Sequence, residues 1–287
     1  MYVVAGVTGN TGKVVADALL AQKKPVRVIV RDAKKGEPWK ARGAEVAVAE
    51  LDDAAALTAA LRGAEGAYLL LPPNFGSTSV RADNARRTKA FVDAIDASGV
   101  KHVVLLSSVG AQHADGTGPI ASLHDAEIAL AKTRAAVTFV RASYFMENTA
   151  SSLYALGDGA LPGFLKLDVA IPMVATDDIG AVAAKALLEG GKGKSVIELA
   201  GPRDYSPRDV AAALTRILGK TITAQLGPES AIVPALQGAG MNDEWAALYR
   251  DMIVGVNSGH VAFEGGAARA LRGPTDLDVV LRRLTAK

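Results

Sequence analysis

The sequence predicts an α/β fold in which a doubly wound parallel sheet carries helices on both faces. Short apolar runs alternate with helical patterns, and residues 103–106 are apolar at every position, as a central parallel strand requires. A β-α-β series of this length places its ligand at the carboxyl ends of the strands. The expected strands are residues 2–5, 26–30, 45–48, 66–71, 101–106 and 136–141. One helix is expected to start near residue 14, and the other expected helices are residues 54–61, 80–97 and 122–132.

A glycine-rich turn, Gly6-Val7-Thr8-Gly9-Asn10-Thr11-Gly12, joins the first strand to the first helical pattern. Glycine permits the sharp bend and the close approach of the backbone to a phosphate, and the first amides and the dipole of the following helix favour an anion. A P-loop is excluded, because its first glycine would fall on Val7 and its Ser or Thr on Val14. The motif predicts a Rossmann dinucleotide site, and the alternative is a structural turn without a ligand.

The end of the second strand indicates which dinucleotide binds. NAD-binding units usually place an acidic residue about 20 positions after the glycine motif, where it bonds the ribose 2′-hydroxyl. Here Arg31 ends the strand and Lys35 follows one turn later, and their charges suit the 2′-phosphate of NADPH. We therefore expect NADP(H). Two alternatives stay open. Asp32 is an acidic residue that could bind the ribose of NAD, and the basic residues could form a solvated turn without a ligand.

Composition excludes several classes of function. The chain has 287 residues, no cysteine and a net charge of +2. Disulfides, thiolate catalysis and cysteine-bound metals are therefore excluded, and so small a charge does not favour nucleic acid as a partner. The basic residues at 81–89 fit a solvated helix face. The four histidines lack metal-ligand spacing, so we expect no metal site.

The sequence also favours a cytoplasmic protein without a membrane partner. No uncharged apolar run approaches the length of about 18 residues that a membrane span needs. The first strand begins at residue 2, which leaves no room for a signal peptide.

The pattern changes after about residue 150. We expect a dinucleotide-binding domain at residues 1–150 and a smaller α/β substrate lobe at residues 151–287, interleaved with the sheet. Within the lobe, Thr176-Asp177-Asp178 is expected to cap one helix and Ser206 another. Residues 227–266 are helical in part and carry no motif that identifies a substrate. The expected lobe elements are strands at 170–175 and 195–199 and helices at 179–188 and 207–218.

In combination, several segments resemble the NmrA-like family of atypical short-chain dehydrogenases/reductases. The resemblance covers nearly the whole chain and is nearest to the NADPH:quinone oxidoreductase-like members. It implies a Rossmann fold, NADP(H) and a small quinone-like substrate, and it allows for a homodimer. The segments that carry it are the glycine-rich turn, Arg31, residues 105–110 (LLSSVG), 124–127 (HDAE), 141–148 (RASYFMEN), 174–179 (VATDDI) and 199–202 (LAGP).

The resemblance implies a set of cofactor-binding residues that follow successive strand ends. Asp52, after the third strand, is expected to approach the adenine. Tyr144 and Phe145, just after the strand that ends at Arg141, are expected to stack on the nicotinamide or on a flat substrate, with plain core packing as the alternative. The full set is Gly6, Thr8, Gly9, Asn10, Thr11, Gly12, Arg31, Lys35, Asp52, Leu71, Pro72, Ser107, Ser108, Val109, Tyr144 and Phe145.

The Tyr-x-x-x-Lys pair of ordinary short-chain dehydrogenases is missing. None of the six tyrosines has a lysine four residues on, and His124 and Ile128 stand where the pair belongs. A quinone accepts hydride directly, so orientation over the nicotinamide suffices. The candidate catalytic residues are therefore His124, a proton donor near neutral pH, and Tyr144. The alternative for His124 is a helix-start histidine without a catalytic role.

The predicted function is an NADPH-dependent oxidoreductase that transfers hydride to quinones or similar small electrophiles. The alternative is a non-catalytic NADP(H)-binding redox sensor, because the same family includes regulators that bind the cofactor. An epimerase or dehydratase is disfavoured by the missing tyrosine-lysine pair.

Overall fold

The structure is a computed structural model that describes residues 1–154 and 156–286. Its main sheet has the strand order β13-β10-β6-β5-β4-β1-β2-β3, and every neighbouring pair is parallel. This confirms the predicted doubly wound parallel sheet. Its strands are β1 (Tyr2–Ala5), β2 (Val26–Val30), β3 (Glu45–Val48), β4 (Gly66–Leu70), β5 (His102–Ser108), β6 (Ala136–Ala142), β10 (Lys194–Ala200) and β13 (Arg269–Arg272).

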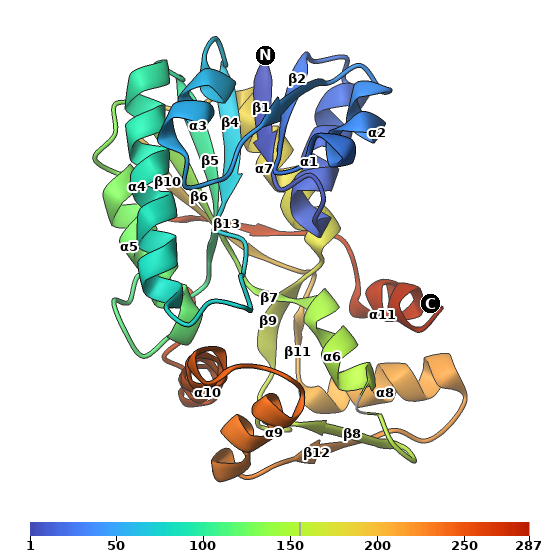
Figure 1. Cartoon of the computed structure of the whole chain (residues 1–287). Helices are drawn as coiled ribbons and strands as arrows, with labels where there is room; N and C mark the ends of the chain where they lie inside the picture. The colour runs from blue at the N-terminus through green and yellow to red at the C-terminus, as the bar shows by residue number, and fades with distance from the viewer. Residues whose placement is uncertain (155, 287) are drawn as a thin grey trace.

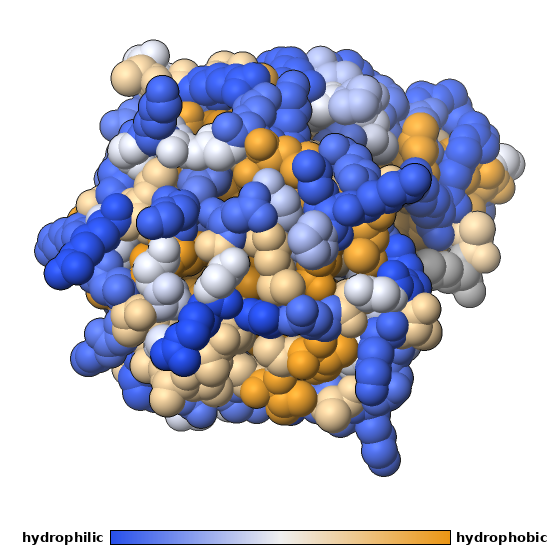
Figure 2. Space-filling view, turned by 90° about the horizontal axis from the view of Figure 1, so that it is seen from above, coloured by the Kyte–Doolittle hydropathy of each residue, from blue (hydrophilic) through white to orange (hydrophobic). Residues whose placement is uncertain are grey.

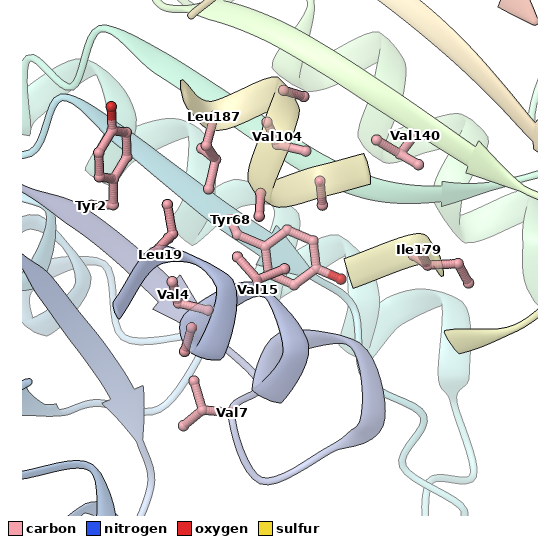
Figure 3. Packing of buried hydrophobic residues seen from close by; sticks show 14 of the residues in the cluster. Tyr2, Val4, Val7, Val15, Leu19, Tyr68, Val104, Val140, Ile179 and Leu187 are labelled. Carbon is pink, nitrogen blue, oxygen red and sulfur yellow. The ribbon is translucent and has the colours of Figure 1, made fainter. Parts of the chain in front are cut away.

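Helices cover both faces of the sheet (Figure 1). Side chains alternate along each strand, so Val3 packs with the helices on one face while Val4 packs on the other. Figure 3 shows the second of these cores, where Val4 and Tyr68 meet Val15 and Leu19. One face carries α3 (Ala54–Leu61), α4 (Val80–Ser98) and α5 (Ala121–Leu130), and the other carries α1 (Asn10–Ala21) and α7 (Thr176–Glu189).

A second group of elements forms a lobe beyond the carboxyl ends of the sheet strands (Figure 1). It has its own hydrophobic core, which includes Met146, Leu161, Tyr205, Leu214 and Leu281. Its strands are β7 (Tyr144–Phe145), β8 (Ala160–Gly163), β9 (Ile171–Val174), β11 (Asp204–Tyr205) and β12 (Thr223–Leu226), and its helices are α6 (Thr149–Tyr154), α8 (Pro207–Leu218), α9 (Ile232–Gly238), α10 (Asp243–Ser258) and α11 (Leu277–Thr285). The remaining short helices are η1 (Ala33–Gly36), α2 (Glu37–Lys40), η2 (Gly118–Ile120), η3 (Met146–Asn148) and η4 (Glu229–Ala231).

The two expected helix caps of the lobe have different outcomes. Ser206 caps α8, with Asp209 completing a reciprocal capping box, as predicted. The expected cap at residues 176–178 is wrong, because α7 already begins at Thr176 and no side chain of its own segment caps it. Instead, the carboxylate of Glu147 accepts hydrogen bonds from the Thr176 amide and hydroxyl. A partner distant in sequence thus replaces the local cap.

The division at residue 150 stays a prediction. The elements α7, β10 and β13 follow that residue and belong to the large sheet and its helical layer, which is the interleaving that was expected. Among the described residues, no helix is both long and apolar enough to cross a membrane. Polar and charged residues cover most of the face seen from above, and hydrophobic residues lie between them in small patches (Figure 2).

His102, at the start of β5, is a buried titratable side chain. Its side chain is only 3% exposed, and its Nε2 lies 2.9 Å from Thr138 Oγ1, while Nδ1 has no partner among the described residues. Burial lowers the pKa of His102 below its usual range. In the unfolded chain the ring takes up a proton near pH 6.5, so that state binds more protons under mildly acid conditions.

We therefore expect the free energy of unfolding to fall as pH is lowered from about 7 to 5. One proton contributes a slope of at most about 1.4 kcal/mol per pH unit. Urea unfolding at several pH values, with wild type and His102→Gln, measures this contribution. The variant should be less stable at pH 7 and less sensitive to acid. Parallel curves for the two proteins would contradict the assignment.

Candidate functional site

The predicted site residues lie along one edge of the large sheet. Because all its strands are parallel, the carboxyl ends of β1 to β6 meet at that edge. From β1 the chain adds β2 and β3 in one direction along the sheet, and it then crosses back to add β4 on the other side of β1. The strand order therefore reverses between β1 and β4. Ligands of open α/β sheets bind in the crevice outside such a switch point. The glycine-rich turn leaves β1 at this position.

The turn holds the start of α1 very close to the end of β1. Gly6 has φ +71°, a left-handed conformation that favours glycine, and its carbonyl accepts the Gly9 amide at 2.9 Å. A side-chain carbon at Gly12 would lie 2.5 Å from the carbonyl oxygens of both Ala5 and Gly6. The helix begins at Asn10, and no side chain caps it. Its first amides are therefore left for an anion.

Two buried contacts hold this helix start in place. The Tyr68 hydroxyl donates to Thr11 Oγ1 at 2.9 Å, and burial raises the pKa of Tyr68, so it remains a donor. On α7, a side-chain carbon at Gly180 would lie 2.5 Å from Val14 Cβ, so the two helices pack in close contact. The side chain of Thr11 thus faces the core, whereas Thr8 and Asn10 are exposed.

At the end of β2, Arg31 and Lys35 are both exposed, and neither side chain has an ion-pair or hydrogen-bond partner among the described residues. Asp32 has a local role instead, because its carboxylate accepts the Lys34 amide at 2.9 Å and caps η1. This geometry favours the arginine over Asp32 as the group that meets a ribose substituent. Asp52, after β3, is exposed.

The ends of β4 and β5 contribute backbone and apolar surface. Leu71 and Pro72 are half-buried, and Val109 is buried. The Ser107 hydroxyl donates to Glu127 Oε1 at 2.5 Å, and the Ser108 hydroxyl donates to the Val109 carbonyl at 3.0 Å. The Ser107 side chain, only 2% exposed, is therefore engaged inside the fold.

A buried ion pair behind these strand ends was not anticipated from the sequence. Arg141, on β6, and Glu127, on α5, are joined at 2.7 Å with both side chains less than 10% exposed. Arg141 also meets Glu264 at 2.5 Å, so the pair fixes α5 and β6 together with the segment before β13. The sequence feature that could have revealed this ion pair is an arginine within the mostly apolar strand β6, because a buried charge requires a partner.

His124 is tied to the loop that follows β5. Its Nδ1 lies 2.9 Å from the Ala111 carbonyl oxygen, which only accepts, so Nδ1 carries the proton. In the neutral ring Nε2 is then an acceptor, and only the imidazolium form can donate a proton from it. Ile128, where the missing lysine would stand, is 47% exposed.

Tyr144 and Phe145 form β7, which pairs in parallel with Met173 and Val174 of β9. Both aromatic side chains are half-buried. Burial, with a smaller contribution from nearby Tyr249, raises the pKa of Tyr144 to about 12. The phenol therefore stays protonated at neutral pH, and the residue lies where the large sheet passes into the lobe.

The predicted site residues lie along one edge of the large sheet, and the grooves of the lobe lie elsewhere. Two surface grooves of about 380 and 440 Å³ lie in the lobe, and none of the predicted site residues lines either of them. Among the described residues, no group of three or more histidine, aspartate or glutamate side chains is placed to hold a metal ion.

Comparison with known proteins agrees with this geometry. The sequence is 32% identical to quinone oxidoreductase 2 of Escherichia coli, over 90% of this chain and 89% of the relative. It is 28% identical to an NAD(P)H azoreductase of Xenophilus azovorans, over 88% and 86%. The crystal structure of the NADPH-dependent quinone oxidoreductase of Escherichia coli in complex with NADPH superposes with a TM-score of 0.85 at 29% identity, covering 99% of this chain and 100% of the other.

The profile of the NmrA-like family matches residues 2–251, which is most of the chain. The matched residues include the glycine-rich turn and every strand of the main sheet except β13. The protein belongs to the NmrA-like family.

Proposed function

We propose that the protein is an NADPH-dependent oxidoreductase that reduces quinones or similar small electrophiles. The observation that carries the proposal is the start of α1, which has no side-chain cap and is held against β1 at Gly12. Beside it, at the end of the adjacent β2, lies Arg31, whose side chain has no partner among the described residues. An anion-binding helix start beside a free guanidinium suits a dinucleotide with a third phosphate. The named relatives, a quinone oxidoreductase and an azoreductase, support the same reaction class.

The residues at the sheet edge fit this cofactor. The amides at Gly9 to Gly12 would hold the pyrophosphate, Arg31 and Lys35 the 2′-phosphate, and Asp52 would approach the adenine. The same set continues along the edge through Leu71, Pro72, Ser107, Ser108, Val109, Tyr144 and Phe145. When bound, NADPH supplies the hydride, and the protein supplies position, orientation and a wall that excludes water.

Burial raises the pKa of Tyr144, so its phenol is a poor proton donor at neutral pH. The Nδ1 proton of His124 is engaged by the Ala111 carbonyl oxygen. Reduction then proceeds without an obligatory protein acid, which suits quinones because water can protonate their weakly basic products. We infer that with quinones His124 mainly positions the loop carrying Val109 and Gly110, and that it is an optional proton donor for ketones and aldehydes.

The expected partner is a small molecule. On α4, which carries the densest basic cluster, Arg81, Arg86 and Lys89 each pair with an aspartate, so much of its charge is neutralised locally. We propose action in the cytoplasm without nucleic acid or membrane, and a homodimer stays a prediction. The sensor alternative gains no support from the relatives, whose names are those of enzymes.

The function is tested by following NADPH absorbance with a panel of small quinones. We expect oxidation well above the uncatalysed rate for at least one of them. Tight NADPH binding with no acceleration across the panel would contradict the proposal and favour the sensor.

We expect Arg31→Ala to weaken NADPH binding and to leave NADH binding nearly unchanged, because NADH has no 2′-phosphate. A charge-assisted pair contributes about 1.5–3 kcal/mol, so the NADPH dissociation constant should rise on the order of 10- to 150-fold. Isothermal titration measures both cofactors. Lys24→Ala is the matched control, because Lys24 is exposed and lies just before the amino end of β2. It should change the affinity for neither cofactor. An unchanged affinity in Arg31→Ala would refute the assignment.

We expect His124→Ala to cost little with quinones and more with any ketone or aldehyde that the enzyme accepts. General acid catalysis typically contributes about 10²–10⁴-fold where protonation is needed in the transition state. Steady-state rates with both acceptor classes, at saturating NADPH, make the comparison. A loss of this size with quinones, at unchanged cofactor affinity, would show that His124 is an essential acid.

A further inference from the structure

Three polar side chains lie side by side on the large sheet, close to its carboxyl edge. Arg141 on β6 is in register with Ser107 on β5 and with Glu198 on β10. Paired residues of neighbouring strands point to the same face, so the three side chains form one row across the sheet. All three are buried. Buried charges require partners, so the groups that meet this row matter for the site.

One partner of the row is the segment of residues 260–264, which we call the strap. It leaves α10, which lies below the sheet on the side of α4 and α5, and leads to β13 (Figure 1). Arg141 Nη1 donates to the Glu264 carboxylate at 2.5 Å, and the amides of Glu264 and Gly265 donate to Glu198 Oε1 at 2.8 and 3.0 Å. The Glu264 side chain is 56% exposed, whereas that of Arg141 is 7% exposed. A surface carboxylate thus fastens the strap to the buried row.

The other half of the strap packs on the loop that follows β5. Gln112 Nε2 donates to the Ala262 carbonyl at 2.8 Å, and His260 Nε2 lies 3.1 Å from the Asp115 carbonyl oxygen. The carbonyl only accepts, so this nitrogen of His260 carries the proton. The His113 and His260 rings are stacked, with their centroids 4.1 Å apart. The strap therefore joins the loop to the sheet row.

Val261 makes the closest contact between the strap and this loop. A side-chain carbon at Gly110 would lie 3.2 Å from Val261 Cγ1, and one at Gly255 of α10 would lie 2.8 Å from Val261 Cγ2. Val261 fills the space between them, so a shift of the strap displaces Gly110 or leaves a gap beside it. Gly259 and Gly265 flank the strap with φ +81° and +72°, and glycine restricts the backbone least. The position of the strap therefore depends on its side-chain contacts.

We propose that Glu264 is a positioning residue for hydride transfer, because through the strap it holds Val109 and Gly110 where they orient the acceptor. The inference rests on the proposed function, which places nicotinamide and acceptor beside this loop. His124 on α5 is the second anchor of the same loop, through the Ala111 carbonyl. Glu264 itself touches neither cofactor nor acceptor in this account.

Steady-state kinetics with 1,4-benzoquinone at saturating NADPH test the role of Glu264. Glu264→Ala should lower kcat about threefold to thirtyfold, because a misplaced loop orients the acceptor poorly, while KM and the NADPH dissociation constant stay within about twofold. Glu264→Gln, whose amide oxygen can still accept from Arg141, should recover part of the loss. Glu45→Gln is the matched control, because Glu45 is 55% exposed, pairs with Arg27 at 2.7 Å and lies at the amino end of β3. It should behave as wild type.

A second variant distinguishes positioning from general structural damage. Val261→Ala removes the contact with Gly110 and therefore acts on the same loop. If Glu264 acts through the strap, the double variant should be no slower than the slower single variant. Losses that multiply, or an unchanged kcat in Glu264→Ala, would overturn the inference. Should Glu264→Ala not fold, Glu264→Gln takes its place in the same comparison, with a smaller expected loss.

Hydrogen exchange separates this inference from the proposed function. The amides of Ala111 and His113 donate to the carbonyls of Ser108 and Gly110, each at 3.1 Å, so their exchange reports how firmly the loop is held. In Glu264→Ala, residues 109–117 should exchange faster than in wild type, and residues 2–21 should not. If wild type does not reduce the quinone, the proposed function fails, yet faster exchange still supports the hold of the strap on the loop. Unchanged exchange overturns the inference whether or not turnover occurs.

Discussion

The rest of the structure depends on the close contact between the start of α1 and the end of β1. At Gly12 there is no space for a side-chain carbon between the helix and the carbonyls of Ala5 and Gly6. At Gly180 of α7 there is likewise no space for a side-chain carbon against Val14 of α1, so α7 packs closely on the same helix. The buried hydrogen bond from Tyr68 to Thr11 joins β4 to the same point. The position of the start of α1 is therefore fixed by its close packing against β1, β4 and α7.

The second half of the chain completes the edge that the first half creates. Glu147 caps α7, and the buried Asp178 on α7 accepts the amide and hydroxyl of Thr275 before α11. The Arg141–Glu127 pair fixes β6 against α5, directly behind the strand end that leads to Tyr144. These contacts join residues that lie 14, 29 and 97 positions apart in sequence. The lobe thus holds Tyr144 and Phe145 at the sheet edge while the sheet holds the glycine-rich turn.

The parts that were predictable from the sequence are those with local causes. The limits of β1, β3 and α3 follow from apolar runs bounded by glycine or aspartate, and Ser206 caps α8 through its own side chain. Strands such as β7 and β11 have only two residues and pair with β9, so no local period reveals them. The cap of α7 and the tautomer of His124 likewise depend on partners distant in sequence. The hydrogen bond from Trp245, on α10, to the Asn74 carbonyl in the loop after β4 was not predicted, because these two segments meet only in the folded chain.

The most direct test of the account is NADPH binding by Gly9→Ala. Unlike Gly12, Gly9 has an extended backbone (φ −103°), and a side-chain carbon there would meet only the Gly6 carbonyl oxygen, at 3.4 Å. The fold therefore accepts alanine, but an added methyl group at this exposed helix start would occupy space needed by a phosphate. We expect a melting temperature within a few degrees of wild type and NADPH affinity weakened on the order of tenfold or more. Unchanged affinity in a stably folded Gly9→Ala protein would contradict the claim that this turn binds the cofactor.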